Sequence, residues 1–421
     1  MNRLHPSTLR RRRKFVSRAL KFSIGGVMAI SALGQDATRF EKLEAENRTL
    51  KERLDKLESM AKKEGIVPSG SEPASMKALK TINVSGFVQA SYFYNTDNPN
   101  DKMSDAYLWN TRHNSFSINK VKLTLASDPI KKDVWDAGYR VSMIWGEDAG
   151  ILNTGGEVQG LEALREAYVN LNVPVGTGLD IKVGQLISLL NYESGDGGAA
   201  NNNFSQGYQW FYTGNGPSAG IQAGYAFNDV VDAKVRVQNG MYAGAIDNNN
   251  SKTVMGSIGI KPVKDLWVNL IGFGGEENAG MTVKGGSVLA GYSGIKNLSL
   301  GMEFDYFMFD FGATDADLWS IGTFVNYDIT DKLGIAARLE YLDDKDGGGL
   351  KGIGPRTGAA FGVGSPEADG YLASATLTLT YKPIANIRIQ PEVRYDTTDY
   401  TGALDGEKSR FIVGAGVSYL F

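Results

Sequence analysis

The sequence predicts an all-β protein: a transmembrane antiparallel β-barrel of about sixteen strands, preceded by a short N-terminal coiled-coil helix. Three observations predict this fold class. Apolar and polar residues alternate with a period of two from about residue 82 onward. The connections between these runs are alternately short and long along the chain. The 421 residues include 52 Gly, 19 Tyr and 18 Phe but no Cys, which is typical of an aromatic-rich, turn-rich β protein.

The alternating runs have one apolar and one polar face. They are clearest over residues 231–238, 371–381, 387–395 and 411–421. A strand of a lipid-facing barrel needs apolar residues outside and polar residues inside over about ten residues. A soluble β-sandwich has the same alternation with its faces exchanged. The alternation therefore predicts strands but does not by itself choose between these two folds.

The connections between strands favour the barrel. We expect short turns at 128–133, 174–178, 228–229, 261–265, 294–297, 330–332 and 382–386. We expect mostly longer polar segments at 95–114, 147–160, 189–216, 240–252, 276–281, 310–317, 343–370 and 397–407. Short turns on the periplasmic side and long loops outside are characteristic of bacterial outer-membrane barrels. Aromatic residues near strand ends, such as Trp135, Trp145 and Tyr419, fit the girdles that mark the two membrane interfaces.

The first 34 residues read as a secretory signal peptide. They hold eight basic residues, no acidic residue, and an apolar stretch from Phe22 to Leu33 that is too short to span a bilayer as a helix. A membrane-anchoring helix is the alternative. Without this segment, 36 of the 44 basic residues remain against 47 acidic ones, a net charge of −11. An acidic mature protein argues against nucleic acid as a partner.

Residues 36–64 have the pattern of a coiled coil. Leu43, Leu50 and Leu57 recur every seven residues, and the flanking charges form pairs of opposite sign for a parallel assembly. A single amphipathic helix packed on its own domain is the alternative. Residues 65–81 begin with a stretch rich in Gly, Pro and Ser, which predicts a linker to the barrel at 82–421.

The residue inventory argues against catalysis and against a bound metal or cofactor. There is no cysteine, and of two histidines His5 lies in the expected signal peptide, which leaves His113 alone. A Ser-His-Asp triad or a multi-histidine metal site therefore lacks parts. We expect neither a cofactor nor a metal, and no enzyme activity.

Several short motifs resemble a known family. They are Val84-Ser85-Gly86-Phe87, Leu164-Arg165-Glu166-Ala167-Tyr168-Val169, and Ile181-Lys182-Val183-Gly184-Gln185 leading into Asn191-Tyr192-Glu193. Over most of residues 82–421 the chain resembles bacterial porins, and most closely the OmpL-like β-barrel porin family, a relative of the phosphate-selective porins. The resemblance implies a water-filled channel in the bacterial outer membrane, assembly as a homotrimer, and an assembly signature in the C-terminal aromatic residue Phe421.

The phase of the strands nominates charged residues that face the pore. The basic ones are Lys120, Lys122, Arg140, Lys182, Lys234, Arg236, Arg338, Arg388, Arg394 and Arg410. The acidic ones are Asp136, Glu166, Asp180, Asp232, Glu303, Asp305, Glu340 and Glu392. Because the two signs nearly balance, we expect no strong ion selectivity from the wall. Pairing between neighbouring strands is the alternative role for any one of these charges.

The segment 189–216 is the candidate constriction loop. It carries Tyr192, Glu193 and Asp196 and is unusually aromatic for a solvated loop. An outward loop packed on its neighbours, or a contact with another protomer, is an equally good reading of the same composition. The sequence thus favours passive diffusion of small hydrophilic solutes or ions. The alternatives are a structural protein whose coil ties the outer membrane to peptidoglycan, and a barrel hydrolase that uses His113.

Overall fold

The computed structural model describes residues 82–421 apart from 107–108, 129–130, 153–160, 242, 245, 248, 279, 314, 345–369 and 401–402. It also describes scattered positions between 49 and 60. The signal peptide expected at 1–34 lies outside the described residues. So do the linker at 65–81 and most of the coiled coil at 36–64, and these expectations stay predictions.

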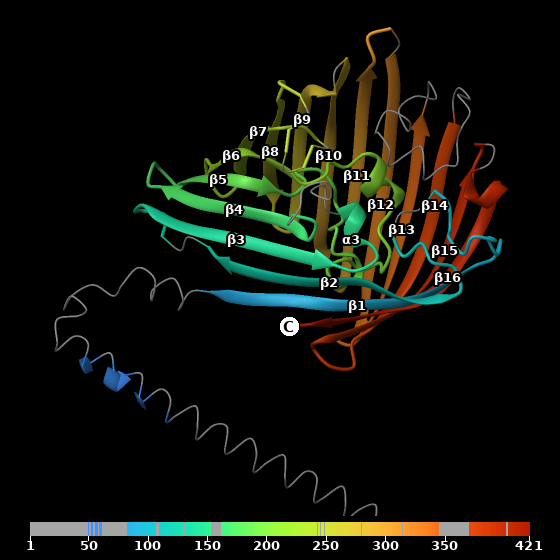
Figure 1. The fold of residues 1–421 in the computed structure, drawn as a ribbon, viewed down its shortest axis with the longest axis horizontal. Coiled ribbons are helices and arrows are strands. Elements are labelled where there is room, and N and C mark those ends of the chain that lie inside the picture. The colour runs from blue at the N-terminus through green and yellow to red at the C-terminus, as the bar shows by residue number, and fades with distance from the viewer. Residues whose placement is uncertain are drawn as a thin grey trace, which may run out of the picture. The chain divides into compact units, whose positions relative to one another are not determined.

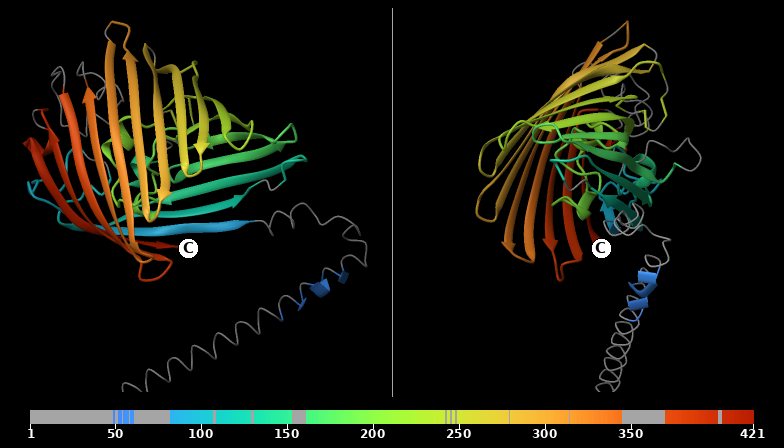
Figure 2. Two further views of the ribbon diagram at one scale, coloured as in Figure 1. Left: turned by 180° about the vertical axis from the view of Figure 1, so that it is seen from behind. Right: turned by 90° about the vertical axis from the view of Figure 1, so that its left-hand side faces the viewer.

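Residues 82–421 form the closed antiparallel barrel of sixteen strands that the alternation and the connections predicted (Figures 1 and 2). Each strand pairs with its neighbours in the sequence, and β1 closes the ring against β16. The strands are β1 Asn83–Asn95, β2 Ser115–Ser127, β3 Asp136–Trp145, β4 Leu164–Val173, β5 Leu179–Leu186, β6 Ser218–Ala226, β7 Val231–Gln238, β8 Thr253–Val263, β9 Leu266–Asn278, β10 Met281–Ile295, β11 Leu298–Asp310, β12 Asp315–Thr330, β13 Leu333–Asp344, β14 Gly370–Tyr381, β15 Ile387–Thr398 and β16 Ser409–Leu420. Short helical segments are α3 Ala149–Leu152, η1 Gly197–Ala199, α4 Tyr208–Tyr212 and η2 Leu404–Gly406.

The two faces of the barrel wall are inverted relative to a soluble protein. Large apolar side chains such as Val235, Leu377 and Val413 are exposed on the outside. Polar and charged side chains at the alternate positions face the interior and are buried, as at Arg236, Thr378 and Arg410. An exposed apolar belt around a polar interior is stable in lipid and unfavourable in water. On this outer surface the rings of Trp319, Tyr341 and Tyr371 lie in contact across β12–β14, with centroids 5.4 and 5.6 Å apart.

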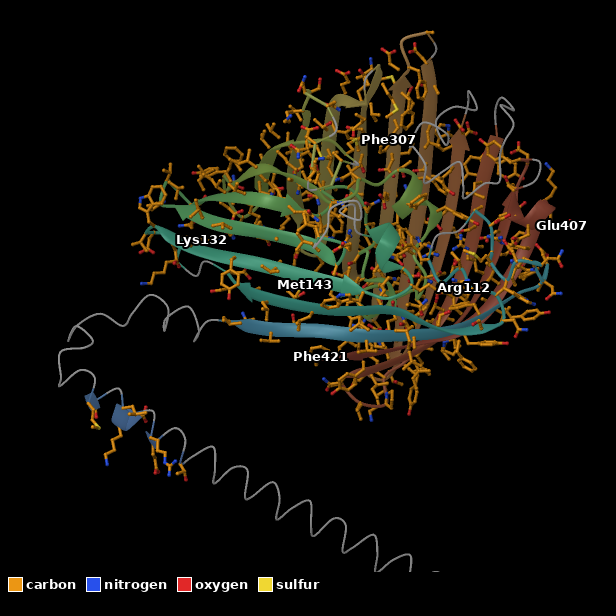
Figure 3. The ribbon with its side chains drawn as sticks, viewed as in Figure 1. Arg112, Lys132, Met143, Phe307, Glu407 and Phe421 are labelled. Atoms are coloured by element: carbon orange, nitrogen blue, oxygen red, sulfur yellow. The ribbon has the colours of Figure 1, made fainter. Side chains whose placement is uncertain are left out.

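Short and long connections lie at opposite ends of the strands. Figure 3 shows Lys132, between β2 and β3, and Glu407, between β15 and β16, at the two ends. The expectation of a longer polar segment at 276–281 was wrong. There β9 continues to Asn278, which pairs with Met281 at the start of β10. The backbone pairing of the two strands extends to the end of the hairpin and leaves only a short turn. In the part of the chain that the structure describes, no helix has the length and apolar character needed to cross a bilayer.

Two β-bulges change which side chains face the interior. The register shifts between β1 and β2 next to Gln89, and between β3 and β4 next to Ser142. A bulge adds one residue to a strand, so that consecutive side chains no longer alternate strictly. As a result the neighbours Asn119 and Lys120 are both buried. Arg165 and Glu166 are buried in the same way.

Candidate functional site

The segment between β5 and β6, residues 187–217, lies inside the barrel, and we call it the inner loop (Figure 2). Its short helix α4 contacts β12, β13 and β14, and η1 contacts β1, β15 and β16. A long loop that runs back into the barrel narrows the interior. Of the two readings of this segment, inward or outward, the contacts place it inward.

One buried ion pair fastens the inner loop to the wall. The Arg338 Nη1 on β13 lies 2.7 Å from Glu193 Oε1 of the loop. The same guanidinium donates to the Ser205 carbonyl oxygen at 2.5 Å, and its Nε lies 3.0 Å from Glu340 Oε2. Burial raises the pKa of Glu193, and the facing Arg338 guanidinium opposes that rise. With both partners removed from water, this pair holds its geometry far better than a surface ion pair.

Carboxylates of the wall accept hydrogen bonds from the loop's backbone. The Tyr192 N–H donates to Glu303 on β11 at 2.8 Å, and the Phe204 N–H donates to Glu392 on β15 at 2.8 Å. The Gln209 N–H donates to Glu340 at 3.0 Å. An irregular loop that enters a barrel needs partners for its backbone groups. The inward-facing acids supply them.

Inward-facing glycines leave room for three loop side chains. A Cβ atom on Gly416 of β16 would lie 1.9 Å from the Phe204 ring. One on Gly301 of β11 would lie 2.2 Å from the Tyr192 ring, and one on Gly322 of β12 would lie 2.1 Å from Gln209 Oε1. These separations are far below van der Waals contact. The wall is therefore shaped to the loop at three positions on three strands.

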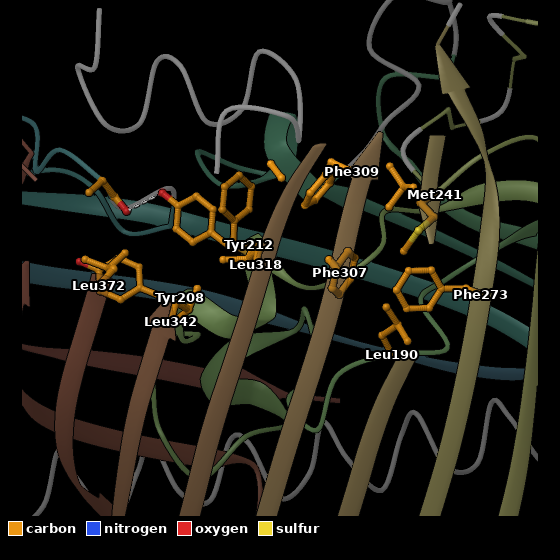
Figure 4. Close-up of a cluster of buried hydrophobic side chains, with 14 of the residues drawn as sticks. Leu190, Tyr208, Tyr212, Met241, Phe273, Phe307, Phe309, Leu318, Leu342 and Leu372 are labelled. Atoms are coloured by element: carbon orange, nitrogen blue, oxygen red, sulfur yellow. Dashed lines mark hydrogen bonds between the residues drawn. The ribbon is translucent and has the colours of Figure 1, made fainter. Parts of the chain in front are cut away.

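An apolar cluster completes the attachment. Figure 4 shows Tyr208 and Tyr212 of α4 beside Leu318, Leu342 and Leu372 of the strands. All five side chains are buried. The same cluster extends to the inner face of β8–β11 through side chains that include Met255, Phe273, Val283, Phe307 and Phe309. This cluster therefore fills part of the barrel interior, whereas charged side chains of β3, β5 and β7 such as Arg140, Lys182 and Lys234 are partly exposed.

On that other side, the loop meets basic residues of the wall. The Lys122 Nζ on β2 lies 2.9 and 2.8 Å from the two carboxylate oxygens of Asp196. Lys122, Arg165 and Asp196 line a recess of about 270 Å³ together with Ser188, Asn191 and Trp210. Beyond the loop, Arg140 faces Glu166 at 3.4 Å. The Lys182 Nζ lies 5.2 Å from the centre of the Tyr168 ring.

The structure brings some of the candidate residues into the loop–wall contact. Arg338, Glu340, Glu303, Glu392 and Glu193 belong to it, as described above. Arg388 donates to the Gly198 carbonyl oxygen at 3.2 Å, and Arg236 donates to that of Ile187 at 2.7 Å. Asp305 accepts from Thr213 at 2.7 Å. Lys182, Lys234, Asp136, Asp180 and Asp232 lie on the wall formed by β3, β5 and β7.

Asp396, Asp148 and Arg165 are among the buried charged residues that the sequence did not predict to face the interior. Asp396 on β15 lies 2.5 Å from Arg394 and 3.1 Å from Arg410. It continues the alternation of Glu392 and Arg394, so extending the predicted strand beyond residue 395 places Asp396 on the inner face. Asp148 lies 3.2 Å from Lys120 and comes from the β3–β4 connection, where no periodic signal exists. Arg165 faces inward only because of the bulge, which strict alternation does not predict.

Both ring nitrogens of His113, the histidine that a hydrolase would need, lie within hydrogen-bonding distance of neighbouring residues. The Asn95 N–H donates to its Nδ1 at 3.0 Å, and its Nε2 lies 2.9 Å from Asn98 Oδ1. Its side chain is buried. A general base must present a free ring nitrogen to its substrate. This imidazole instead ties the first long connection to β1.

A closed sixteen-strand barrel with an apolar outer surface, a polar interior and a loop folded inside defines the class of outer-membrane channel proteins. Residues 81–421 match the family described as "Putative beta-barrel porin-2, OmpL-like". The chain belongs to this family. No curated protein matches the sequence.

Solved porin structures share the fold at low sequence identity. The anion-selective porin from Comamonas acidovorans has a TM-score of 0.54 and 12% identity, over 81% of this chain and 99% of that one. OmpT of Vibrio cholerae in its trimer form has a TM-score of 0.53 and 14% identity, over 81% and 99%. The outer membrane channel DcaP of Acinetobacter baumannii has a TM-score of 0.53 and 13% identity, over 81% and 97%. At such identities the similarity concerns the fold alone.

The family and the barrel together establish the function class. The protein is a porin of the bacterial outer membrane, a channel for passive diffusion and not an enzyme. The expected localisation, the function class and the sixteen-strand barrel are confirmed.

Proposed function

We propose that small hydrophilic solutes and ions cross through the space between the inner loop and the wall of β2–β7, with the inner loop as the constriction. The single observation that carries this is the set of buried contacts that hold the loop against β11–β16. Its ion pair with Arg338 lies on β13, and its backbone hydrogen bonds to Glu303 and Glu392 lie on β11 and β15. On the opposite side the loop meets Lys122 of β2, and the charged side chains of Asp136, Arg140, Asp180, Lys182, Asp232 and Lys234 remain partly exposed.

In this proposal the candidate pore residues divide into two roles. Lys122, Arg140, Lys182, Lys234 and Asp232 line the passage. Other candidates fix the constriction by holding the loop or its neighbours: Glu193, Tyr192, Arg338, Glu340, Arg388, Glu392, Arg394 and Arg410. Fixed charges and a rigid narrow section are what a selective aqueous pore requires.

Cysteine accessibility tests the passage, because the natural chain contains no cysteine. Lys182→Cys and Leu377→Cys would each be incorporated into planar bilayers and treated with a charged, water-soluble thiol reagent. The proposal predicts a change of conductance for Lys182→Cys and none for Leu377→Cys, which lies on the exposed apolar outer surface. An unmodified Lys182→Cys channel would contradict the route.

We also propose that the protein works as a homotrimer through the barrel and the predicted coil. The trimer form of one solved porin with the same fold supports this. Cross-linking in mild detergent is the test, and a product no larger than a monomer would contradict it. Binding of the coil to peptidoglycan stays a prediction from the sequence, to be tested by sedimentation with purified cell wall.

A further inference from the structure

The inward-facing charges of the barrel divide into two groups according to whether the inner loop covers them. The covered group lies on β11–β16. Its acids are Glu303, Asp305, Glu340, Glu392 and Asp396, and its bases include Arg338, Arg394 and Arg410. All of these residues are buried, with at most 4% of the residue exposed, and the five acids outnumber the three bases. Near balance between acidic and basic residues in the sequence therefore does not mean balance at the surface of the passage.

The covered acids are already in use. Glu303, Glu340 and Glu392 accept hydrogen bonds from loop N–H groups. Asp305 accepts from Gln209, Thr213 and Ser320 at 2.8, 2.7 and 3.0 Å. Asp396 lies against Arg394 and Arg410. A carboxylate that is buried and hydrogen-bonded within the protein contributes little to the field in a neighbouring aqueous passage, and no permeating cation can touch it.

The uncovered group lies on β2–β7, and its charges are ordered along the strands. The acids Asp136, Asp180 and Asp232 stand at the first or second residue of β3, β5 and β7, beside the short turns. The basic residues lie deeper. Lys122, Arg140 and Lys182 are interior to their strands and partly exposed, with 14% of the Lys122 side chain and 33% of the Arg140 side chain accessible.

At the depth of the loop, basic groups therefore exceed acidic ones. Arg165 and Lys122 line the recess beside the loop, and Arg140 and Lys182 continue the positive wall below it. The acids at this depth are Glu166, which is buried against Arg140, and two of the loop's own residues, Asp196 and Glu193, of which Glu193 is paired with Arg338. Positive charge on the wall of a narrow pore attracts anions and repels cations.

The recess beside Lys122 and Arg165 has room for a small anion. Its volume is about 270 Å³, and Ser188 and Asn191 add polar groups to the two cations. Two acids also line it: Glu193, which is paired with Arg338, and Asp196. Lys122 already binds a carboxylate there, since both oxygens of Asp196 lie within 2.9 Å of its Nζ. The Asp196 side chain keeps 22% of its surface accessible. An anion that enters from the passage can compete with it for Lys122 and Arg165.

We propose that the channel prefers anions, and that Lys122 and Arg165 form a binding site for small anions, such as chloride or a carboxylate, at the constriction. Asp196 is the internal competitor for that site. This inference rests on the proposed passage between the loop and β2–β7. It differs from the expectation of a wall without strong selectivity, because the loop buries the acids of β11–β15.

The test is the reversal potential of the channel in planar bilayers under a potassium chloride gradient. The wild type is expected to give the sign of an anion-preferring pore. The variant Lys122→Gln/Arg165→Gln is expected to shift the potential toward cations. Asp196→Asn is expected to shift it further toward anions, because it removes the competing charge and leaves both cations in place.

The control is Lys284→Gln. Lys284 is an exposed lysine on β10, and it faces outward because its neighbour Val283 is buried in the interior cluster. It carries the same charge as Lys122 but lies outside the passage, so its removal should leave the reversal potential unchanged. A shift as large as that of the double variant would show a general effect of net charge and would overturn the site.

The remaining outcomes separate this inference from the proposed function. Channels that prefer cations, or that discriminate neither sign, would overturn the anion preference while leaving the porin function intact. An anion preference that survives both Lys122→Gln/Arg165→Gln and Asp196→Asn unchanged would overturn the site. A protein that forms no channel at all would contradict the porin function itself. If the double variant does not fold, the opposite shift expected of Asp196→Asn still decides the matter.

Discussion

Arg338 on β13 and Glu193 of the inner loop, 145 residues apart in the sequence, form a buried ion pair with 2.7 Å between Nη1 and Oε1. Arg338 lies in a strand and Glu193 in an irregular segment, so the two residues share no element of secondary structure. The pair is therefore a direct, buried link between the loop and the wall, and it helps to fix the position of the loop.

Removing one partner of this pair should be strongly destabilising. Arg338→Gln leaves Glu193 buried without its counter-charge, a change that costs about 3–5 kcal/mol. Lys252→Gln removes a lysine from an exposed pair with Asp247 and should cost about 0–1 kcal/mol. Urea-dependent unfolding in lipid vesicles measures both. Equal losses in the two variants would contradict the anchoring role of the Arg338–Glu193 pair.

Gly416 should be required because Phe204 occupies the space above it. Gly416→Leu places a side chain where the Phe204 ring lies, so the loop must shift and the single-channel conductance should change. Adding Phe204→Ala should restore the conductance toward that of the wild type, because it vacates the space. Gly272→Leu is the matched control, since nothing lies within 4 Å of a Cβ at that position. Failure of Phe204→Ala to rescue would show that the two residues do not interact in this way.

The outer surface should behave as a surface in contact with lipid. Leu377→Arg, at a position 46% exposed on β14, should cost about 2–4 kcal/mol if it lies near the middle of the membrane. Ile246→Arg, 55% exposed in the connection between β7 and β8, should cost little. Folding yield into vesicles compares them. In a soluble barrel the two substitutions would be equally harmless, and that result would refute the lipid contact.

The barrel should fold without the predicted coiled coil. The contacts that close the ring lie within residues 86–421, where Gly86 and Phe421 exchange backbone hydrogen bonds of 2.8 and 3.0 Å. Deletion of 36–64 is therefore expected to leave channels of unchanged conductance and to weaken trimers in mild detergent. Loss of the channels on this deletion would show that the barrel depends on the coil.

Much of the fold follows from local patterns in the sequence. Alternation along β7 places Val235 outside and Arg236 inside without reference to any other strand, and the turn residues set the number of strands. Only part of the candidate site could be predicted from the sequence. The strand phase predicted that Arg338 and Glu392 face inward. It could not predict that Glu193 and the Phe204 N–H reach them, because these contacts join segments more than 100 residues apart.

Two features of the interior do not follow from the alternation of single strands. A bulge turns Arg165 inward, and the inner loop buries charged residues such as Glu303, Glu340 and Arg338 that alternation alone places in an open pore. Both are consequences of tertiary structure, namely a register shift between strands and the burial of acids such as Glu303 and Glu340 beneath a distant segment. Counting inward-facing charges along single strands treats every one of them as accessible.

The passage beside the inner loop is tested most directly by single-channel conductance in planar bilayers. The wild type is compared with a variant in which residues 197–206 of the inner loop are replaced by a short Gly-Ser linker. If the loop is the constriction, the wild type forms open channels and the shortened variant conducts more. Wild-type protein that forms no channels, or a shortened loop that leaves the conductance unchanged, would contradict this.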